Sequence, residues 1–257
     1  MIELTIDGDV AEITLNAPDK LNALNADALG QLRQAFASAE GARALVLRGE
    51  GRAFCAGRDI AGLDTSDDDV LGLLDGIMQP LMQQIAEFQA PTFAVAHGAC
   101  LGLGLGLLIA CDVVYVAESA KIGSPFANLG ATLDSGGHAL FVERLGAHKT
   151  LDLIYTGRLM SGAEAVQSGL FSQVFPDAEV LEATRAAAAK AATGATQAFL
   201  ESKRLVQQLR DERVGLWESM TAESRAQAAL SATDDYREGF AAFNEKRPPV
   251  FTGRARA

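Results

Sequence analysis

The stretch that decides the fold runs from residue 91 to residue 112, Pro91-Thr-Phe-Ala-Val-Ala-His-Gly-Ala-Cys-Leu-Gly-Leu-Gly-Leu-Gly-Leu-Leu-Ile-Ala-Cys-Asp112. Its first residues favour a buried strand over 92–96, and the apolar run after the glycines predicts a helix over 101–110. A strand, a glycine-rich turn and a helix in that order present free backbone N–H groups at the start of the helix, where they can receive negative charge. The stretch therefore predicts a site that acts largely through its main chain.

Strand and helix patterns alternate on both sides of this stretch. Residues 2–6 and 10–15 alternate across Asp7-Gly8-Asp9, which is a strong hairpin signal. Residues 61–76 predict a loop leading into a helix that ends near Phe88. Further strands are expected at 44–48, 113–117 and 170–175, and further helices after Asn25, at 135–145 and after the capping box Ser161-Gly-Ala-Glu164. This order predicts an α/β fold with right-handed crossovers.

The composition changes beyond Asp177 to Ala, Gln, Lys, Glu and Arg with helical spacing, so three or four helices are expected in the last part of the chain. We therefore expect an α/β core over residues 1–195 and a C-terminal helical region over residues 196–257.

Charge and hydropathy exclude several classes of partner. The chain has 257 residues, 49% of them hydrophobic, and a formal net charge of -11. A substantial core is expected, and the acidic balance argues against binding to nucleic acid or to an anionic membrane surface. The amino terminus shows no basic segment before an apolar stretch, and the charge-free run 98–111 is too short to span a bilayer. We expect a cytoplasmic protein with neither nucleic acid nor membrane as partner.

The cysteines and histidines do not favour a metal site. Cys55, Cys100 and Cys111 stand in apolar surroundings, which predicts reduced, buried thiols rather than disulfides. No C-x-x-C spacing occurs and the His residues are isolated, so no metal ion is expected.

The alternate glycines Gly102, Gly104 and Gly106 miss the G-x-G-x-x-G spacing of a dinucleotide fingerprint, and no acidic residue follows at the expected distance. Two interpretations remain for them: a helix start that receives a carbonyl oxygen, and close helix packing through small residues. Upstream, Phe54-Cys-Ala-Gly-Arg-Asp-Ile60 is either a second place where N–H groups approach a ligand or an ordinary turn.

Asp134 precedes the helix expected at 135–145. An Asp in this place can cap the helix with its side chain, or it can be held anionic by the helix N-terminus and act as a base. The residues alone favour the cap. His97 and His138 are not expected to be catalytic.

Taken together, these segments resemble the crotonase superfamily, the family of enoyl-CoA hydratases and isomerases. The resemblance covers nearly the whole chain, and the matching segments stand in family order: residues 16–24, 54–60, 98–112, 120–123, 129–130, 136–137 and 156–170. It implies a spiral of β-β-α units with a C-terminal helical trimerisation region, and a homotrimer or a dimer of trimers. It also implies an acyl-CoA thioester substrate, with coenzyme A carried by the substrate and no separate cofactor.

The resemblance also implies site residues by position. The main-chain N–H groups of Arg58 and Leu103 would hold the thioester oxygen, and two preorganised donors of this kind stabilise an enolate. The substrate-binding positions would be Leu21, Ala23, Ala56, Gly57, Asp59, Ile60, Gly102, Gly104, Phe126 and Gly130.

The chain departs from the hydratase pattern where that pattern carries its catalytic glutamates. Those positions fall on Gly106 and, after Pro125, on Phe126. Adding water across a double bond needs acid and base groups around the water, so hydration is disfavoured. Asp134-Ser-Gly-Gly137 and the segment 235–253 are instead similar to the ring-modifying isomerases of phenylacetyl-CoA breakdown.

This likeness changes the interpretation of Asp134 from a cap to a catalytic proton shuttle. We therefore expect a double-bond isomerase. The alternatives are an enoyl-CoA hydratase, an inactive acyl-CoA-binding homologue and, from the glycine run, a nucleotide-dependent oxidoreductase.

Overall fold

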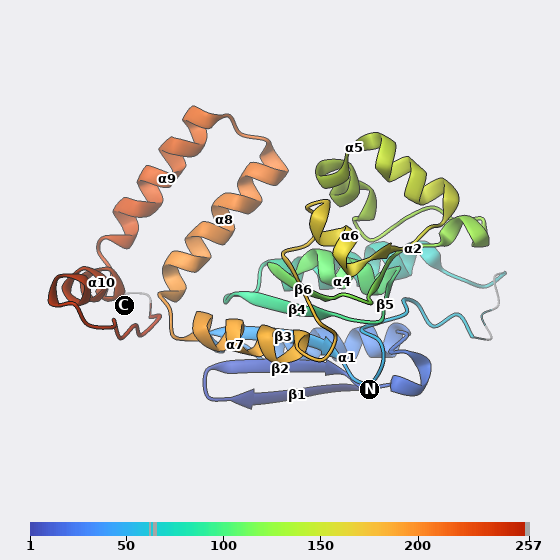
Figure 1. Ribbon diagram of the computed structural model, residues 1–257, viewed down its shortest axis with the longest axis horizontal. Coiled ribbons are helices and arrows are strands. Elements are labelled where there is room, and N and C mark those ends of the chain that lie inside the picture. Colours follow the sequence, from blue (N-terminus) through green and yellow to red (C-terminus); the bar gives the residue numbers. More distant parts are fainter. Residues whose placement is uncertain (62, 64–65, 255–257) are drawn as a thin grey trace.

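The computed structural model describes residues 1–61, 63 and 66–254 (Figure 1). Strands and helices alternate as far as residue 192, and helices alone follow. The strands are β1 (Ile2–Asp7), β2 (Val10–Leu15), β3 (Ala44–Gly49), β4 (Thr92–Ala96), β5 (Ala99–Leu101), β6 (Val113–Ala117), β7 (Lys121–Gly123), β8 (Met160–Ser161) and β9 (Gln173–Phe175).

The helices of the core surround these strands. They are α1 (Ala26–Ser38), α2 (Val70–Leu73), α3 (Gln79–Ala86), α4 (Leu103–Ala110), α5 (Gly137–Thr156), α6 (Gly162–Gln167) and α7 (Val180–Ala192), with the short turns η1 (Pro18–Lys20), η2 (Leu74–Met78) and η3 (Phe126–Leu129). The C-terminal helices are α8 (Thr196–Glu212), α9 (Leu216–Leu230) and α10 (Asp234–Glu245).

The main sheet has the strand order β1-β2-β3-β4-β6-β9. β1 and β2 pair antiparallel, with Ile2 opposite Leu15, and the later neighbours pair in parallel. Helix α7 packs across β2, β3, β4, β6 and β9, while α1 packs against β1 and α3. β4 is buried along its whole length, as expected of a strand covered on both faces. The expected hairpin and α/β class are confirmed.

Several element boundaries differ from the sequence-based expectations. The strand expected at 170–175 is only three residues long, β9 at Gln173–Phe175. Residues 99–101 form strand β5, which pairs with β7, so α4 begins at Leu103 rather than at residue 101. Helix α2 begins at Val70, inside the loop expected at 61–76; positions 62, 64 and 65 of that loop lie outside the described residues. The helix expected at 135–145 begins at Gly137 and continues to Thr156, beyond a backbone break at Gly146.

The C-terminal helices leave the sheet. Helices α8 and α9 form a hairpin beside the core, and α10 lies at the far end with the C-terminal segment (Figure 1). Lys203 of α8 returns to the core through its Nζ atom, which lies 3.0 Å from Asp112 Oδ2. Helix α8 begins at Thr196, next to the boundary we expected, and the assignment of this region to trimerisation stays a prediction.

Within the described part of the chain, no helix is both long and apolar enough to cross a membrane. The same residues contain no cluster of three or more His, Cys, Asp or Glu side chains suited to a metal ion. All three cysteines are free and buried, as the sequence predicted.

Candidate active site

The turn Cys55–Asp59 presents one unused main-chain donor. The N–H of Gly57 donates to Cys55 Sγ over 3.3 Å, and the N–H of Asp59 donates to the carbonyl of Leu24 over 2.8 Å. Leu24 in turn donates to the carbonyl of Gly57, which makes an isolated bridge between Leu24 and Arg58. The N–H of Arg58 has no partner among residues 1–61, 63 and 66–254. The N–H groups on either side of Arg58 are therefore used in hydrogen bonds within the fold, and the N–H of Arg58 is left for a ligand.

The start of α4 supplies a second group of donors. The first hydrogen bond within this helix runs from the N–H of Gly106 to the carbonyl of Gly102, over 3.1 Å. In the described structure the N–H groups of Leu103, Gly104 and Leu105 have no acceptor. The positive end of the helix adds to their pull on a negative oxygen. The Leu103 side chain is buried in the core, so it leaves its own N–H uncovered.

Glycine at position 57 brings the two donor turns together. Gly57 has a left-handed φ of +102°, and a Cβ there would lie 2.9 Å from the carbonyl oxygen of Leu101 and 3.7 Å from the Cα of Gly102. A Cβ at Gly102 would lie 3.1 Å from Cζ of Phe126. The N–H groups of Arg58 and Leu103 thus belong to touching turns with the Phe126 ring beside them. The role of these two N–H groups as an oxyanion hole stays a prediction.

The other two glycines of the run serve close packing. A Cβ at Gly104 would lie 2.7 Å from Cβ of Cys55, and one at Gly106 would lie 2.6 Å from Cβ of Ser135. Of the two interpretations that the sequence left open for these glycines, packing through small residues holds at Gly104 and Gly106. Gly102, the N-cap of α4 with φ of +52°, belongs to the donor turn.

Asp134 does not cap helix α5 with its side chain. The N-cap is Gly136 and receives no side-chain hydrogen bond; only the main-chain carbonyl of Asp134 accepts, from the N–H of Gly137 over 2.9 Å. The carboxylate instead accepts a hydrogen bond from Ser135 Oγ at 2.8 Å, through Oδ1. The interpretation of Asp134 as a side-chain cap is therefore wrong.

The surroundings of Asp134 favour its protonated form. Burial raises the pKa of the half-buried Asp134 carboxyl above its ordinary value, and the hydrogen bond from Ser135 and the charge of His138 lower that pKa by less. Desolvation outweighs the two effects that favour the anion, so the net shift of the Asp134 pKa is upward. A carboxyl with a raised pKa suits both halves of a proton shuttle.

Helix α4 connects Asp134 to the donor turns. Ser135, the neighbour of Asp134, packs on Gly106, which stands three residues after Leu103 and therefore about 4.5 Å further along the helix axis. The position that carries the first glutamate in hydratases is thus covered by Ser135 and by the methyl group of Met78, which would lie 2.9 Å from a Cβ there. The position that carries the second glutamate in hydratases is occupied by Phe126.

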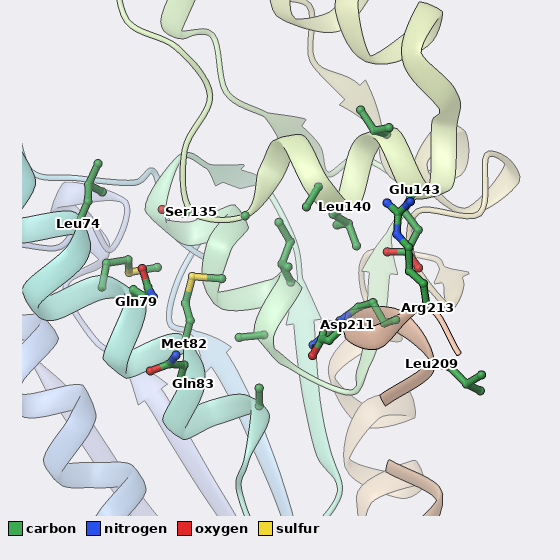
Figure 2. A pocket seen from close by; sticks show the side chains of 18 residues that line it. Leu74, Gln79, Met82, Gln83, Ser135, Leu140, Glu143, Leu209, Asp211 and Arg213 are labelled. Atoms are coloured by element: carbon green, nitrogen blue, oxygen red, sulfur yellow. Dashed lines mark hydrogen bonds and ion pairs between the residues drawn. The ribbon is translucent and has the colours of Figure 1, made fainter. Parts of the chain in front are cut away.

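A cavity of about 950 Å³ lies beside the turn that follows Asp134, although Asp134 itself is not among its lining residues (Figure 2). It lies between α3, α4, α5 and the end of α8, with Ser135 and Gly136 in its wall and Met82 projecting into its middle. Arg58 and Leu103 do not line it. Its remaining lining is apolar near α3 and α4 and charged where α5 meets the end of α8: Leu74, Met78, Gln79, Gln83, Ala86, Ile109, Ala110, Ala139, Leu140, Val142, Glu143, Leu209, Arg210, Asp211 and Arg213.

Sequence reasoning missed this cavity almost entirely. Met78 and Met82 stand at helical spacing, a pattern that indicates a buried face but not what it is buried against. The residues of α8 come from more than a hundred positions further along the chain, and no local pattern pairs them with α3.

Most of the remaining predicted substrate-binding residues belong to the 21–24 segment and the first donor turn. The N–H of Ala56 donates to the carbonyl of Leu21 over 2.9 Å, which joins the 21–24 segment to the first donor turn. Asp59 pairs with Lys20 at 2.8 Å, and Ile60 beside it is 52% exposed. Gly130 is exposed on the turn that follows η3. Hydrogen bonds and an ion pair thus join the segment that contains Leu21 and Ala23 to the turn that contains Ala56 and Asp59.

Known proteins share both the sequence pattern and the fold. The family model of the enoyl-CoA hydratase/isomerase family matches residues 5–254. A probable enoyl-CoA hydratase of Rhizobium meliloti is 38% identical over 96% of each chain. The 2,3-dehydroadipyl-CoA hydratase of Escherichia coli is 32% identical over 94% of each chain.

Among solved structures, the enoyl-CoA hydratase from Bacillus anthracis superimposes with a TM-score of 0.89 at 29% identity, over 98% of this chain and 99% of that one. The match in sequence extends over nearly the whole chain, and the match in structure includes the C-terminal helices. This protein therefore belongs to the enoyl-CoA hydratase/isomerase family of the crotonase superfamily.

Proposed function

We propose that the protein is a double-bond isomerase of acyl-CoA thioesters, with Asp134 as its proton shuttle. In a 3-enoyl thioester, the Asp134 carboxylate takes a proton from C2, beside the thioester. The electron pair of that C–H bond passes into a dienolate, whose oxygen accepts hydrogen bonds from the N–H groups of Arg58 and Leu103. The carboxylic acid then returns the proton at C4, so the double bond moves from C3–C4 to C2–C3.

The observation that carries the proposal is the environment of Asp134. Its side chain is half-buried and is not used as a helix cap, and the next two residues, Ser135 and Gly136, line a cavity large enough for an acyl group. One carboxyl group suffices to take and return a proton. Each main-chain donor of such a site contributes roughly a hundredfold or more to the rate.

The places where hydratases of this family carry glutamates support isomerisation over hydration. Gly106 has no space for a side chain because Ser135 and Met78 occupy it. Phe126 presents an aromatic ring beside Gly102, and such a ring offers a water molecule neither an acid nor a base. A water molecule over the thioester would lack the paired groups that hydration needs.

Hydration is the second candidate because several relatives carry that name, including the 2,3-dehydroadipyl-CoA hydratase. The third candidate, an acyl-CoA-binding homologue without catalysis, is motivated by the same two missing glutamates. Substrate turnover distinguishes all three.

The test is a panel of 2-enoyl, 3-enoyl and ring-substituted acyl-CoAs, followed by chromatography of the products, with the parent protein and Asp134→Asn. We expect isomerised thioesters from the parent and a loss of kcat of about a hundredfold or more in the variant, because general acid–base catalysis contributes that much. Asp152→Asn, which alters an exposed carboxylate on the outer part of α5, should keep parental activity.

Three outcomes would overturn the proposal. Hydration of 2-enoyl-CoA as the parent's main reaction would favour the hydratase, and binding of the thioesters without turnover would favour the inactive homologue. Full activity of Asp134→Asn on a substrate that the parent isomerises would remove the shuttle.

A further inference from the structure

Ser135 has a backbone conformation that its residue type disfavours. Its φ is +50°, in the left-handed region, and it is followed by Gly136 at +78°. A residue with a Cβ pays energy to stay there, and such strain persists only where the surrounding structure fixes it. Glycine would be the favoured residue at this position on backbone grounds alone.

The side chain of Ser135 has two contacts that glycine could not make. Its Cβ covers Gly106 of α4, where an added Cβ would come within 2.6 Å of it. Its hydroxyl donates to Oδ1 of Asp134 over 2.8 Å. Oδ2 of Asp134 has no hydrogen-bond partner within the described part of the chain. The hydroxyl therefore holds one carboxylate oxygen and leaves the other uncommitted.

We propose that Ser135 is a positioning residue, strained into the left-handed region so that its hydroxyl fixes Oδ1 of Asp134 and aims Oδ2 at the substrate. The inference rests on the proposed function of Asp134 as proton shuttle. Packing on Gly106 anchors the serine to the same helix whose start carries the Leu103 donor. The segment that carries the base thus packs against the helix whose start carries one oxyanion donor.

The charges around Asp134 leave Ser135 as its one close polar partner in the described structure. His138 on α5 acts on it through charge alone. Helix α4 and turn η3 carry no ionisable side chain. The elements that line the cavity contribute Asp75 on η2, Glu143 on α5, and Arg210, Asp211 and Arg213 at the end of α8, while Arg58 of the first donor turn is paired with Asp68.

The sign of the pH effect follows from these contacts. A base works in its deprotonated form, so activity is present above the pKa of Asp134 and is lost as the pH falls through it. The Ser135 hydroxyl stabilises the carboxylate and lowers that pKa, against the effect of burial. Removing the hydroxyl must raise the pKa and move the acidic limb of kcat/KM to higher pH.

Two variants separate this role from a structural one. Ser135→Ala removes the hydroxyl and keeps the strain, whereas Ser135→Gly removes the hydroxyl, the strain and the Cβ that packs on Gly106. We expect the acidic limb to shift upward equally in the two, with kcat/KM on that limb about tenfold below the parent, because one hydrogen bond to a charged group is lost. Thermal stability should differ between them, with Ser135→Gly the more stable. Ser38→Ala, at an exposed serine at the end of α1, is the control.

Titration of the Asp134 carboxyl by 13C NMR gives a readout that needs no turnover, and its midpoint should rise in both variants. Loss of activity in Asp134→Asn together with unshifted pH profiles in both serine variants would overturn the inference and leave the proposed function standing. A loss of activity in the two serine variants that only parallels their loss of thermal stability would also overturn the inference. Full activity of Asp134→Asn would remove the proposed function and the inference with it.

Discussion

Cys55, Cys100 and Cys111 lie in the core, and their environment decides their reactivity. Burial raises the pKa of Cys55 to about 12 and raises the pKa of Cys111 further. For Cys100, burial and the neighbouring Cys55 act in the same direction. Since the thiolate is the reactive form, buried neutral thiols should be inert.

We therefore predict that the folded protein reacts slowly with a thiol-specific disulfide reagent at about pH 8, and that the three thiols appear on unfolding in denaturant. The measurement is the absorbance of the released chromophore with time. Rapid modification of one thiol in the folded protein would show that the core around it opens readily.

At the scale of single residues, the proposed donors were more predictable than the proposed base. Gly57 and Gly102 indicate a close approach of the main chain, because residues other than glycine rarely adopt their backbone conformations. The structure places the turns that contain them in contact. The role of Asp134 was ambiguous because an Asp just before a helix can serve either as a helix cap or as a base. The proposed role of Asp134 involves Ser135, which has a left-handed φ and packs against α4, a contact between segments some thirty residues apart.

At the scale of elements, two helical glycines should respond oppositely to the same substitution. Gly30 is exposed on α1 and has no atom within 4 Å of an added Cβ. Gly106 on α4 has Ser135 and Met78 within 3 Å of one. Alanine has a higher helix propensity than glycine. At a buried contact, however, the stability lost through overpacking exceeds the stability gained from that propensity.

We expect Gly30→Ala to stabilise the protein by about 0.5–1 kcal/mol and Gly106→Ala to destabilise it by about 1–3 kcal/mol. Thermal unfolding of both variants and the parent, at one protein concentration, measures the difference. An equal response of the two glycines would mean that α5 yields freely at Ser135, and the close packing inferred there would be wrong.

The elements most accessible to sequence reasoning were those with local causes. The hairpin across Asp7-Gly8-Asp9 and the Asn25 cap of α1, whose Oδ1 accepts from the N–H of Ala28 at 2.9 Å, need only neighbouring residues. Strand β5 was missed because it exists only through its pairing with β7, some twenty residues later. Periodicity assigned part of it to the helix that follows.

At the scale of the whole molecule, Arg43 anchors the C-terminal region to the sheet. It stands just before β3, and its guanidinium donates to the carbonyls of Gly194 at 2.6 Å and Phe251 at 3.1 Å and to Thr196 Oγ1 at 3.3 Å. One side chain thus holds the α7–α8 junction and the C-terminal segment together. Nothing in the local sequence around residue 43 predicts partners more than 150 positions away.

We predict that Arg43→Ala lowers the unfolding temperature and speeds tryptic cleavage after Lys246, because each carbonyl loses a charged donor worth about 1.5–3 kcal/mol. The C-terminal segment would still be held by Asp235, which accepts from the N–H groups of Thr252 and Gly253, so Arg43→Ala with Asp235→Asn should be cleaved faster than either single variant. Arg33→Ala, at an exposed arginine on α1, is the matched control. If Arg43→Ala is cleaved at the parental rate and unfolds at the parental temperature, packing of α8 on the core rather than this arginine fixes the helical region.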